Sequence, residues 1–200
     1  MIEFIEKDPR LTNTQSLNIT YPRTINVAFG NYPVVEDIHN LIISIKNNID
    51  PDISYATNVR SNMTKFKFLN DNLIIKRFLD FCVAKHQLTS PGIFEYFYSR
   101  KKVEDCWGNE LNKGDEVVMH NHEKIHGILY LSGGNPTIFP ELNIKIHPSP
   151  GDYYFFPPSI LHYVEKQISD EKRYTVIFNI SENTSWHEDK KIREKYGKNV

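Results

Sequence analysis

The chain has 200 residues, of which 40% are hydrophobic, and its 24 basic and 25 acidic residues give a formal net charge of −1. This length and hydrophobic content suit one well-buried core, so we expect residues 1–200 to form a single domain. The balanced charge gives no signal for nucleic acid, and no apolar run approaches membrane-spanning length. Cys82 and Cys106 stand at unrelated spacing, which argues against a disulfide framework and a thiolate metal cluster. We therefore expect a cytoplasmic protein.

Two helices are expected in the first half of the chain. Between residues 37 and 49, isoleucine and leucine recur at three- and four-residue steps, which places one apolar stripe on a helix. Glu36 and Asp37 favour the N-terminal end of its dipole. Residues 71–85 show a second stripe, which Asn70 or Asp71 can cap.

From about residue 91 the pattern changes to short runs rich in Tyr, Phe, Ile and Val, separated by Gly, Pro and Asn. Such runs are typical of an antiparallel sheet protein. We therefore expect helical support at about residues 33–90, a β-core at about 91–180, and a polar C-terminal tail at about 181–200.

Three histidines within seven residues are the first indication of chemistry. His120, His122 and His126 share one parity, so in an extended segment His120 and His122 point to the same side. Imidazoles arranged in this way can occupy neighbouring coordination positions of a first-row metal. A lone histidine is more often a surface or hydrogen-bonded residue, but a His-x-His pair makes a metal site a serious hypothesis.

A second stretch supplies the third ligand. An aromatic run over residues 153–156 leads into Pro157-Pro158-Ser159, and an extended segment then begins near His162. A rigid corner fixes the direction of the segment after it, which suits a ligand that must keep one rotamer. We therefore predict His120, His122 and His162 as the metal ligands, although the same run would also suit an ordinary hairpin corner.

The last predicted strand covers residues 173–179 and alternates in polarity. Tyr174, Val176 and Phe178 fall on one face, while Arg173, Thr175 and Asn179 fall on the other. If the polar face lines a pocket, Arg173 is suited to hold a carboxylate with two hydrogen bonds. An exposed arginine in a surface salt bridge is the alternative interpretation.

A larger set of residues runs in a fixed order through the C-terminal half of the chain: Trp107, Lys113-Gly114-Asp115, His120-Asn121-His122, His126 to Leu131, Gly151 to Pro157, His162 and Arg173 to Asn179. In this order, with eleven residues from His162 to Arg173, the set resembles the 2-oxoglutarate/Fe(II)-dependent oxygenases of phages and marine bacteria. These enzymes are distant relatives of prolyl hydroxylases. Weaker similarity extends to residues 57–59 and 63–64.

The resemblance implies a mainly β fold with supporting helices, whose core is a double-stranded β-helix (a cupin-like jelly roll). It also implies an Fe(II)- and 2-oxoglutarate-dependent dioxygenase that hydroxylates a C–H bond and releases succinate and CO2. His120 and His162 match the two family histidines, and His122 stands where the wider superfamily has Asp or Glu. Arg173 matches the residue that binds the distal carboxylate of 2-oxoglutarate, assisted by Tyr130 or Thr175.

Other expectations concern the rest of the pocket and the partners. His126, Trp107 and Asn179 could line the same pocket, although Trp107 also suits the core. The substrate is expected to be a small molecule or a peptidyl group, and a homodimer is one expected assembly.

Two alternatives stay open. The spacing of Gly114, His120-x-His122, His126 and Gly133 fits the first cupin motif, with His126 where a glutamate is usual. The run from Gly151 through Pro157 and Ser159 to His162 fits the second, so a three-histidine cupin enzyme without 2-oxoglutarate would share the fold. Arg173 separates the two, because a cupin gives it no fixed task. The other alternative is a non-catalytic metal-binding accessory protein.

Overall fold

The computed structural model describes residues 2–4, 25, 27–87 and 101–182. Two α-helices, one short 3-10 helix (Pro140–Leu142) and twelve strands lie in this part of the chain. The α-helices are α1 (Val35–Lys46) and α2 (Leu73–Gln87). The strands are β1 (Ile2–Phe4), β2 (Ala28–Asn31), β3 (Val59–Arg60), β4 (Asn62–Met63), β5 (Lys101–Leu111), β6 (Glu116–His120), β7 (Ile125–Tyr130), β8 (Thr137–Phe139), β9 (Ile144–Ile146), β10 (Asp152–Phe156), β11 (His162–Val164) and β12 (Arg173–Glu182).

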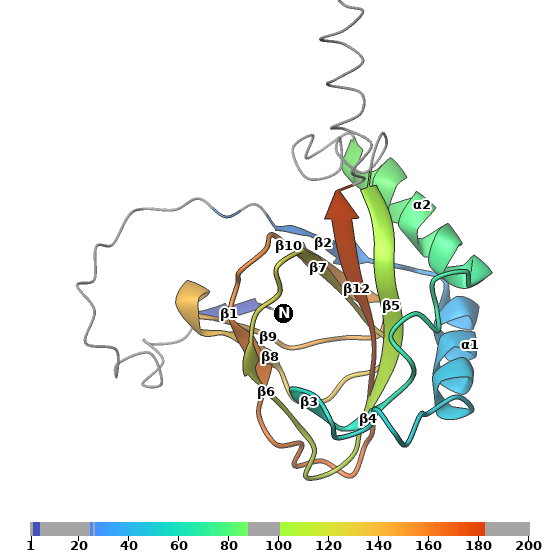
Figure 1. The fold of residues 1–200 in the computed structure, drawn as a ribbon. Helices are drawn as coiled ribbons and strands as arrows, with labels where there is room; N and C mark the ends of the chain where they lie inside the picture. Colours follow the sequence, from blue (N-terminus) through green and yellow to red (C-terminus); the bar gives the residue numbers. More distant parts are fainter. Residues whose placement is uncertain (1, 5–24, 26, 88–100, 183–200) are drawn as a thin grey trace, which may run out of the picture.

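The strands form two six-stranded sheets that face each other (Figure 1). One sheet has the order β1-β9-β8-β11-β6-β3, and the other has the order β2-β10-β7-β12-β5-β4. The pairs are antiparallel, and most consecutive strands alternate between the two sheets; the exceptions are β4 with β5 and β8 with β9, which pair within one sheet. This is the arrangement of a jelly roll, so the predicted mainly β fold with a double-stranded β-helix core is confirmed.

The molecule has a hydrophobic layer on each side of the second sheet. One layer fills the space between the two sheets and includes Trp107, Tyr130 and Phe156. The other lies between the second sheet and the two helices and includes Ile45 and Phe78. The helices cover the outer face of the sheet near β5 and β12 (Figure 1). They therefore hold the sheet from behind and leave its inner face free to build a site.

Close packing of α1 depends on a glycine in β5. A Cβ atom added to Gly108 would lie 2.3 Å from a side-chain carbon of Ile45. Because real atoms do not approach so closely, only glycine lets α1 lie this near to the strand. The odd-numbered neighbours of Gly108 on β5 point to the opposite side, into the space between the sheets.

The predicted helices are confirmed, with small shifts at their ends. α1 begins at Val35, and its Asp37 is buried and pairs with Arg77 of α2. The α2 cap differs from the prediction: Asn72, not Asn70 or Asp71, accepts the backbone N–H groups of Ile74 and Ile75. An N-cap side chain contacts the amides two or three residues ahead, so a helix that begins at Leu73 selects Asn72.

The N-terminal half contributes more than helical support. β2 pairs with β10, β3 with β6, and β4 with β5, so segments before residue 90 extend both sheets. The polar tail after residue 182 and the segment 88–100 lie outside the described residues. Within the described chain, neither helix has the length and apolar content needed to cross a membrane.

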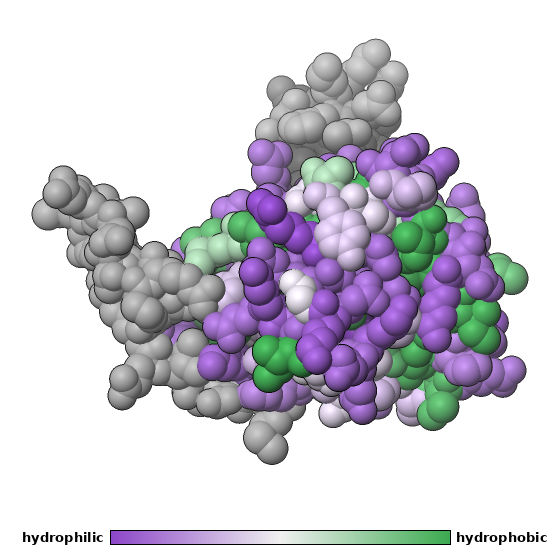
Figure 2. Space-filling view, turned by 90° about the horizontal axis from the view of Figure 1, so that it is seen from below, coloured by the Kyte–Doolittle hydropathy of each residue, from purple (hydrophilic) through white to green (hydrophobic). Residues whose placement is uncertain are grey.

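The lower face of the molecule is mainly hydrophilic (Figure 2). Hydrophobic side chains gather toward the side on which α1 and α2 lie (Figure 2).

Candidate metal centre and anion pocket

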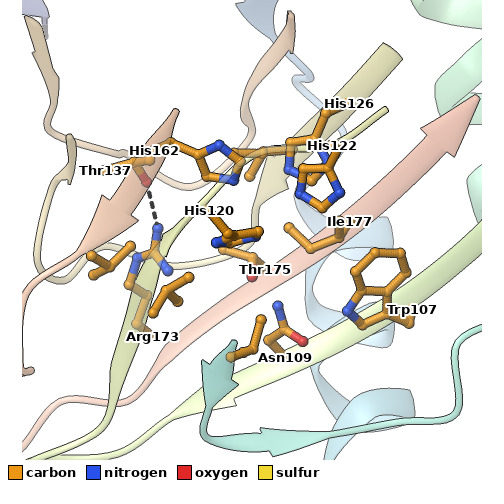
Figure 3. A pocket seen from close by; sticks show the side chains of 14 residues that line it. Trp107, Asn109, His120, His122, His126, Thr137, His162, Arg173, Thr175 and Ile177 are labelled. Atoms are coloured by element: carbon orange, nitrogen blue, oxygen red, sulfur yellow. Dashed lines mark hydrogen bonds between the residues drawn. The ribbon is translucent and has the colours of Figure 1, made fainter. Parts of the chain in front are cut away.

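A narrow pocket lies between the two sheets. Both sheets contribute to its wall, and the lining residues are Val59, Trp107, Asn109, Val117, His120, His122, His126, Ile128, Thr137, His162, Val164, Arg173, Thr175 and Ile177. Figure 3 shows the histidines gathered on one side of this space and Arg173 reaching in from another. The sequence predictions of a metal site and of a pocket with Arg173 in its wall therefore concern one and the same place.

Pairs of directly opposed residues on β12 and β5, here called rungs, line the pocket one after another. In the register of β12 and β5, Arg173 lies opposite Leu111, Thr175 opposite Asn109, and Ile177 opposite Trp107. Directly opposed residues in an antiparallel pair share a face, and two residues advance the strand by about 7 Å. From Arg173 to Trp107 the wall therefore runs about 13 Å, with Thr175 and Asn109 between them. Figure 3 shows the same order.

The three predicted metal ligands are brought together. His120 ends β6 and His162 begins β11, and the two are directly opposed in the register of these strands. His122 lies in the turn after β6. The nitrogen atoms that these three rings offer lie within 4.8 Å of one another. The ring centroids of His120 and His162 are 4.5 Å apart, and those of His120 and His122 are 4.9 Å apart.

Strand parity explains only part of this arrangement. The condition on which the parity prediction rested, an extended segment through His122, is not met, because β6 ends at His120 and β7 begins only at Ile125. The turn is fixed from the other side by the Pro157-Pro158-Ser159 corner. There Ser159, with a positive φ of 69°, donates its backbone N–H to the His122 carbonyl at 2.7 Å. The predicted rigid corner therefore holds His122 as well as His162.

Backbone carbonyls orient two of the rings. His120 Nδ1–H donates to the carbonyl oxygen of Val118 at 2.7 Å, and His162 Nδ1–H donates to that of Ile160 at 3.1 Å. Both rings consequently keep a free Nε2 lone pair, which is the form that binds a metal. The Nε2 atom of His122 is buried and has no hydrogen-bond partner among the described residues.

The histidines are neutral at pH 7. Burial, which disfavours the charged form, lowers the pKa of His162 to about 3 and that of His122 to about 4, helped in both rings by the neighbouring His120. Burial also lowers the pKa of His120, and it holds the pKa of His126 well below the usual range. Neutral imidazoles packed together, each with one unprotonated ring nitrogen, are ready to bind a cation.

Arg173 is the charged group of the pocket. It is 3% exposed, donates from Nη2 to Thr137 Oγ1 at 2.8 Å, and its guanidinium lies 5.3 Å from the centre of the Tyr130 ring. Tyr130 also donates its hydroxyl hydrogen to Thr137 at 2.8 Å. Burial lowers the pKa of the Arg173 guanidinium, although an arginine stays charged at pH 7. A buried charge whose partners, Thr137 and Tyr130, are both neutral is costly, which is a reason to expect an anion beside it.

A glycine in the loop before β8 leaves room for the Arg173 side chain. Gly134 has a φ of 125°, and a Cβ atom added there would lie 2.9 Å from the Cβ of Arg173. The buried Gln167 binds this loop from behind: its Oε1 accepts the N–H of Asn135, and its backbone N–H donates to Asp115. Three loops therefore converge behind the arginine and hold it in place.

Several buried polar atoms of the pocket have no partner among the described residues. They are Arg173 Nε, Thr175 Oγ1, Asn109 Oδ1, Trp107 Nε1 and His122 Nε2. Buried polar groups in folded proteins are nearly always hydrogen-bonded, so a concentration of unpaired ones marks a place where a ligand completes the structure. Arg173 Nε and Thr175 Oγ1 lie at one end of the pocket, and the donor set there suits a carboxylate.

The other predicted pocket residues have mixed outcomes. Trp107, His126 and Thr175 line the pocket, whereas Tyr130 and Asn179 are not among its lining residues. The Tyr130 ring packs against the Arg173 guanidinium, and Asn179 Oδ1 lies 3.4 Å from Nδ1 of His126. His126 stacks on His122 with ring centroids 3.8 Å apart but stands outside the group of three ligand atoms.

Sequence reasoning missed Asn109 and Thr137. Asn109 could have been found, because it shares strand parity with Trp107 and lies two residues after it. Thr137 comes directly after Pro136 at the start of β8 and carries no motif of its own.

Neither the scan against protein-family models nor the search of curated proteins gave a match. Solved structures do match. The viral collagen prolyl hydroxylase of Paramecium Bursaria Chlorella virus-1, in its 2OG complex, has a TM-score of 0.55 at 15% identity, covering 76% of this chain and 95% of that one. A Pseudomonas putida prolyl-4-hydroxylase has a TM-score of 0.56 at 12% identity, covering 78% and 93%. HygX from Streptomyces hygroscopicus, with nickel and 2-oxoglutarate bound, has a TM-score of 0.56 at 9% identity, covering 78% and 83%. At these identities the matches show that the fold is shared.

Proposed function

We propose that this protein is a non-haem Fe(II)- and 2-oxoglutarate-dependent dioxygenase that hydroxylates a C–H bond of its substrate. The observation that carries the proposal is the pairing of two features in one pocket. Three neutral histidines present their nitrogens to a common point, and a buried arginine whose Nε has no partner among the described residues lies farther along the same pocket. Solved structures with the same fold support it, because those of the viral prolyl hydroxylase and of HygX are complexes with 2-oxoglutarate.

His120, His122 and His162 are the residues that would hold the metal. Three ligands from one side leave the other coordination positions of a first-row ion free for small molecules, which is the arrangement of non-haem iron oxygenases. When bound, Fe(II) and 2-oxoglutarate together supply the oxidising chemistry: one oxygen atom of O2 goes into succinate, with loss of CO2, and the other into the substrate C–H bond.

Arg173 would bind the distal carboxylate of 2-oxoglutarate. Its Nε–H makes no hydrogen bond to the described residues, and the Thr175 hydroxyl, one rung away, is an additional donor without a partner among them. Tyr130 and Thr137 orient the guanidinium rather than the carboxylate. Gly134 and Gln167 hold the arginine from behind, so little side-chain freedom is lost on binding.

The three-histidine cupin alternative accounts for the metal group but leaves Arg173 without a task. An arginine that is 3% exposed and has only the neutral partners Thr137 and Tyr130 would destabilise such a protein. The non-catalytic alternative has the same difficulty, because a structural metal site needs no vacant donors at the far end of a pocket.

The direct test is turnover of the cofactor. Protein reconstituted with Fe(II) should convert 2-oxoglutarate to succinate in the presence of O2, slowly without a substrate and faster with one. His162→Ala should remove this activity, and Arg60→Met, which removes an exposed positive charge on β3, should retain it. Absence of succinate from metal-loaded wild-type protein would overturn the proposal.

A further inference from the structure

One hydrogen-bond donor of the pocket lies where the cofactor does not reach. The indole Nε1 of Trp107 is buried without a partner among the described residues, and the residue as a whole is 3% exposed. It lies two rungs beyond Arg173, about 13 Å along the strand pair, which is longer than the five-carbon chain of 2-oxoglutarate. Figure 3 shows Arg173 and Trp107 on opposite sides of the pocket.

Phe66 packs against this indole, and the two rings meet edge to face with centroids 5.2 Å apart. This contact leaves the N–H group unsatisfied, so the donor needs an acceptor atom from a ligand. Acceptor atoms of high charge density, such as those of anions, satisfy a buried N–H most strongly.

The sum of the charges in the loaded pocket also favours an anion near Trp107. Among the described lining residues Arg173 alone carries a formal charge, and none is Asp or Glu. A divalent metal and Arg173 together bring three positive charges, and 2-oxoglutarate brings two negative ones. One positive charge remains, because His122 stands where a carboxylate would have cancelled it.

The buried carboxylate next to Asn109 on β5 does not compensate this charge. Glu110 comes directly after Asn109 on β5, so its side chain points to the other face of the sheet. There it accepts hydrogen bonds from Tyr174, Lys172 and Asn62. An uncompensated charge inside a protein is unfavourable, so the loaded pocket should favour a second anion.

We propose that the metal- and 2-oxoglutarate-loaded site takes up a second, monovalent anion on the Trp107 side of the metal, with its acceptor atom toward Trp107 Nε1–H. The anion is either the carboxylate of an organic substrate or a small inorganic ion. Cationic substrates are disfavoured by the same charge. This inference rests on the proposed function, since the charge balance includes the metal and the cofactor.

The test uses azide, chloride and acetate as probes. Full-length protein is loaded anaerobically with Fe(II) and saturating 2-oxoglutarate, and each anion is titrated while the visible absorption of the complex is recorded. All spectra are corrected for ionic strength with a matched perchlorate series. We expect a saturable spectral change with azide. Tighter binding of acetate than of chloride would identify the carboxylate of an organic substrate as the source, and the reverse would identify an inorganic ion.

Two substitutions at one position separate charge from shape. His122→Asp and His122→Asn have side chains of equal size, but only the first restores the missing negative charge. The aspartate variant should bind azide at least about tenfold more weakly than the asparagine variant, because a unit charge a few ångströms away acts in a partly buried site. Cobalt titration verifies that both variants bind a metal. Trp107→Phe, which keeps the ring and removes the donor, should weaken azide binding in the otherwise unchanged protein by about threefold to tenfold.

The outcomes are distinguishable. If 2-oxoglutarate itself gives no spectral change, the proposed function fails. If the 2-oxoglutarate complex forms but none of the three anions alters its spectrum, only the second-anion site is overturned. Equal azide affinity in wild-type protein and Trp107→Phe would also overturn it, even if neither His122 variant holds a metal.

Discussion

Replacing Arg173 by methionine should change stability and cofactor binding in opposite directions. The guanidinium is 3% exposed, has one hydrogen bond to Thr137, and has an unpaired Nε. In the unliganded protein such a charge is costly, and methionine fills a similar volume without it. We expect Arg173→Met to stabilise the metal-free protein by about 1 kcal/mol or more, which would raise the Tm by about 2–4 °C.

The same substitution should nearly abolish 2-oxoglutarate binding. Removing one member of a buried, hydrogen-bonded charge pair costs about 2–5 kcal/mol, so the Kd should rise by about 30-fold to several thousand-fold. The histidine group lies farther along the pocket, and metal affinity should stay within about threefold. Calorimetric titration of 2-oxoglutarate into cobalt-loaded protein and thermal unfolding of the metal-free protein measure both effects.

Arg60→Met is the control for net charge, since this residue is exposed on β3. It should leave both quantities unchanged. Unaltered 2-oxoglutarate affinity in Arg173→Met would refute the carboxylate role. A large loss of stability in the metal-free variant would instead show that Arg173 is a structural residue.

Two further predictions concern the support of the arginine and the charge state of the histidines. Gly134→Ala should lower 2-oxoglutarate affinity about tenfold and destabilise the protein by about 1–3 kcal/mol, because the φ of Gly134 is 125° and the new Cβ would lie 2.9 Å from the Cβ of Arg173. Gly133→Ala is the control, since its new Cβ would have its nearest neighbour 3.7 Å away. It should change neither the affinity nor the stability in the same titration and thermal unfolding measurements. The metal-free protein should lose stability as the pH falls below about 6.5. The unfolded chain takes up protons there, while His122 and His162 stay neutral down to about pH 4 and 3, so each contributes a slope of up to about 1.4 kcal/mol per pH unit. Urea unfolding between pH 7.5 and 5 measures this slope, and stability independent of pH over that range would contradict it.

The parts of the site that depend on short-range patterns were predictable from the sequence. Alternation along residues 173–179 put Arg173 and Thr175 on the pocket face, and the structure places both there. The rigid corner before His162 and the opposition of His162 to His120 are consistent with the spacing of the motif. These features depend on residues a few positions apart, where strand geometry is strict.

Features that depend on the turn between β6 and β7 were not predictable. His122 reaches the metal group because the chain leaves the strand after His120, and a period-two pattern does not record where a strand ends. The β-strands before residue 90 were missed for a related reason. β3 and β4 have two residues each, too few to show any alternation, and their places depend on partners about fifty residues away.

The most direct test of the central claim is an anaerobic titration. Wild-type protein loaded with Fe(II), which we propose binds to His120, His122 and His162, is titrated with 2-oxoglutarate while the visible charge-transfer absorption is recorded. We predict a band that saturates at one equivalent of cofactor and that is absent from Arg173→Met at the same concentrations. Absence of the band from wild-type protein that holds Fe(II) would contradict the account, and an equal band in Arg173→Met would contradict the role given to the arginine.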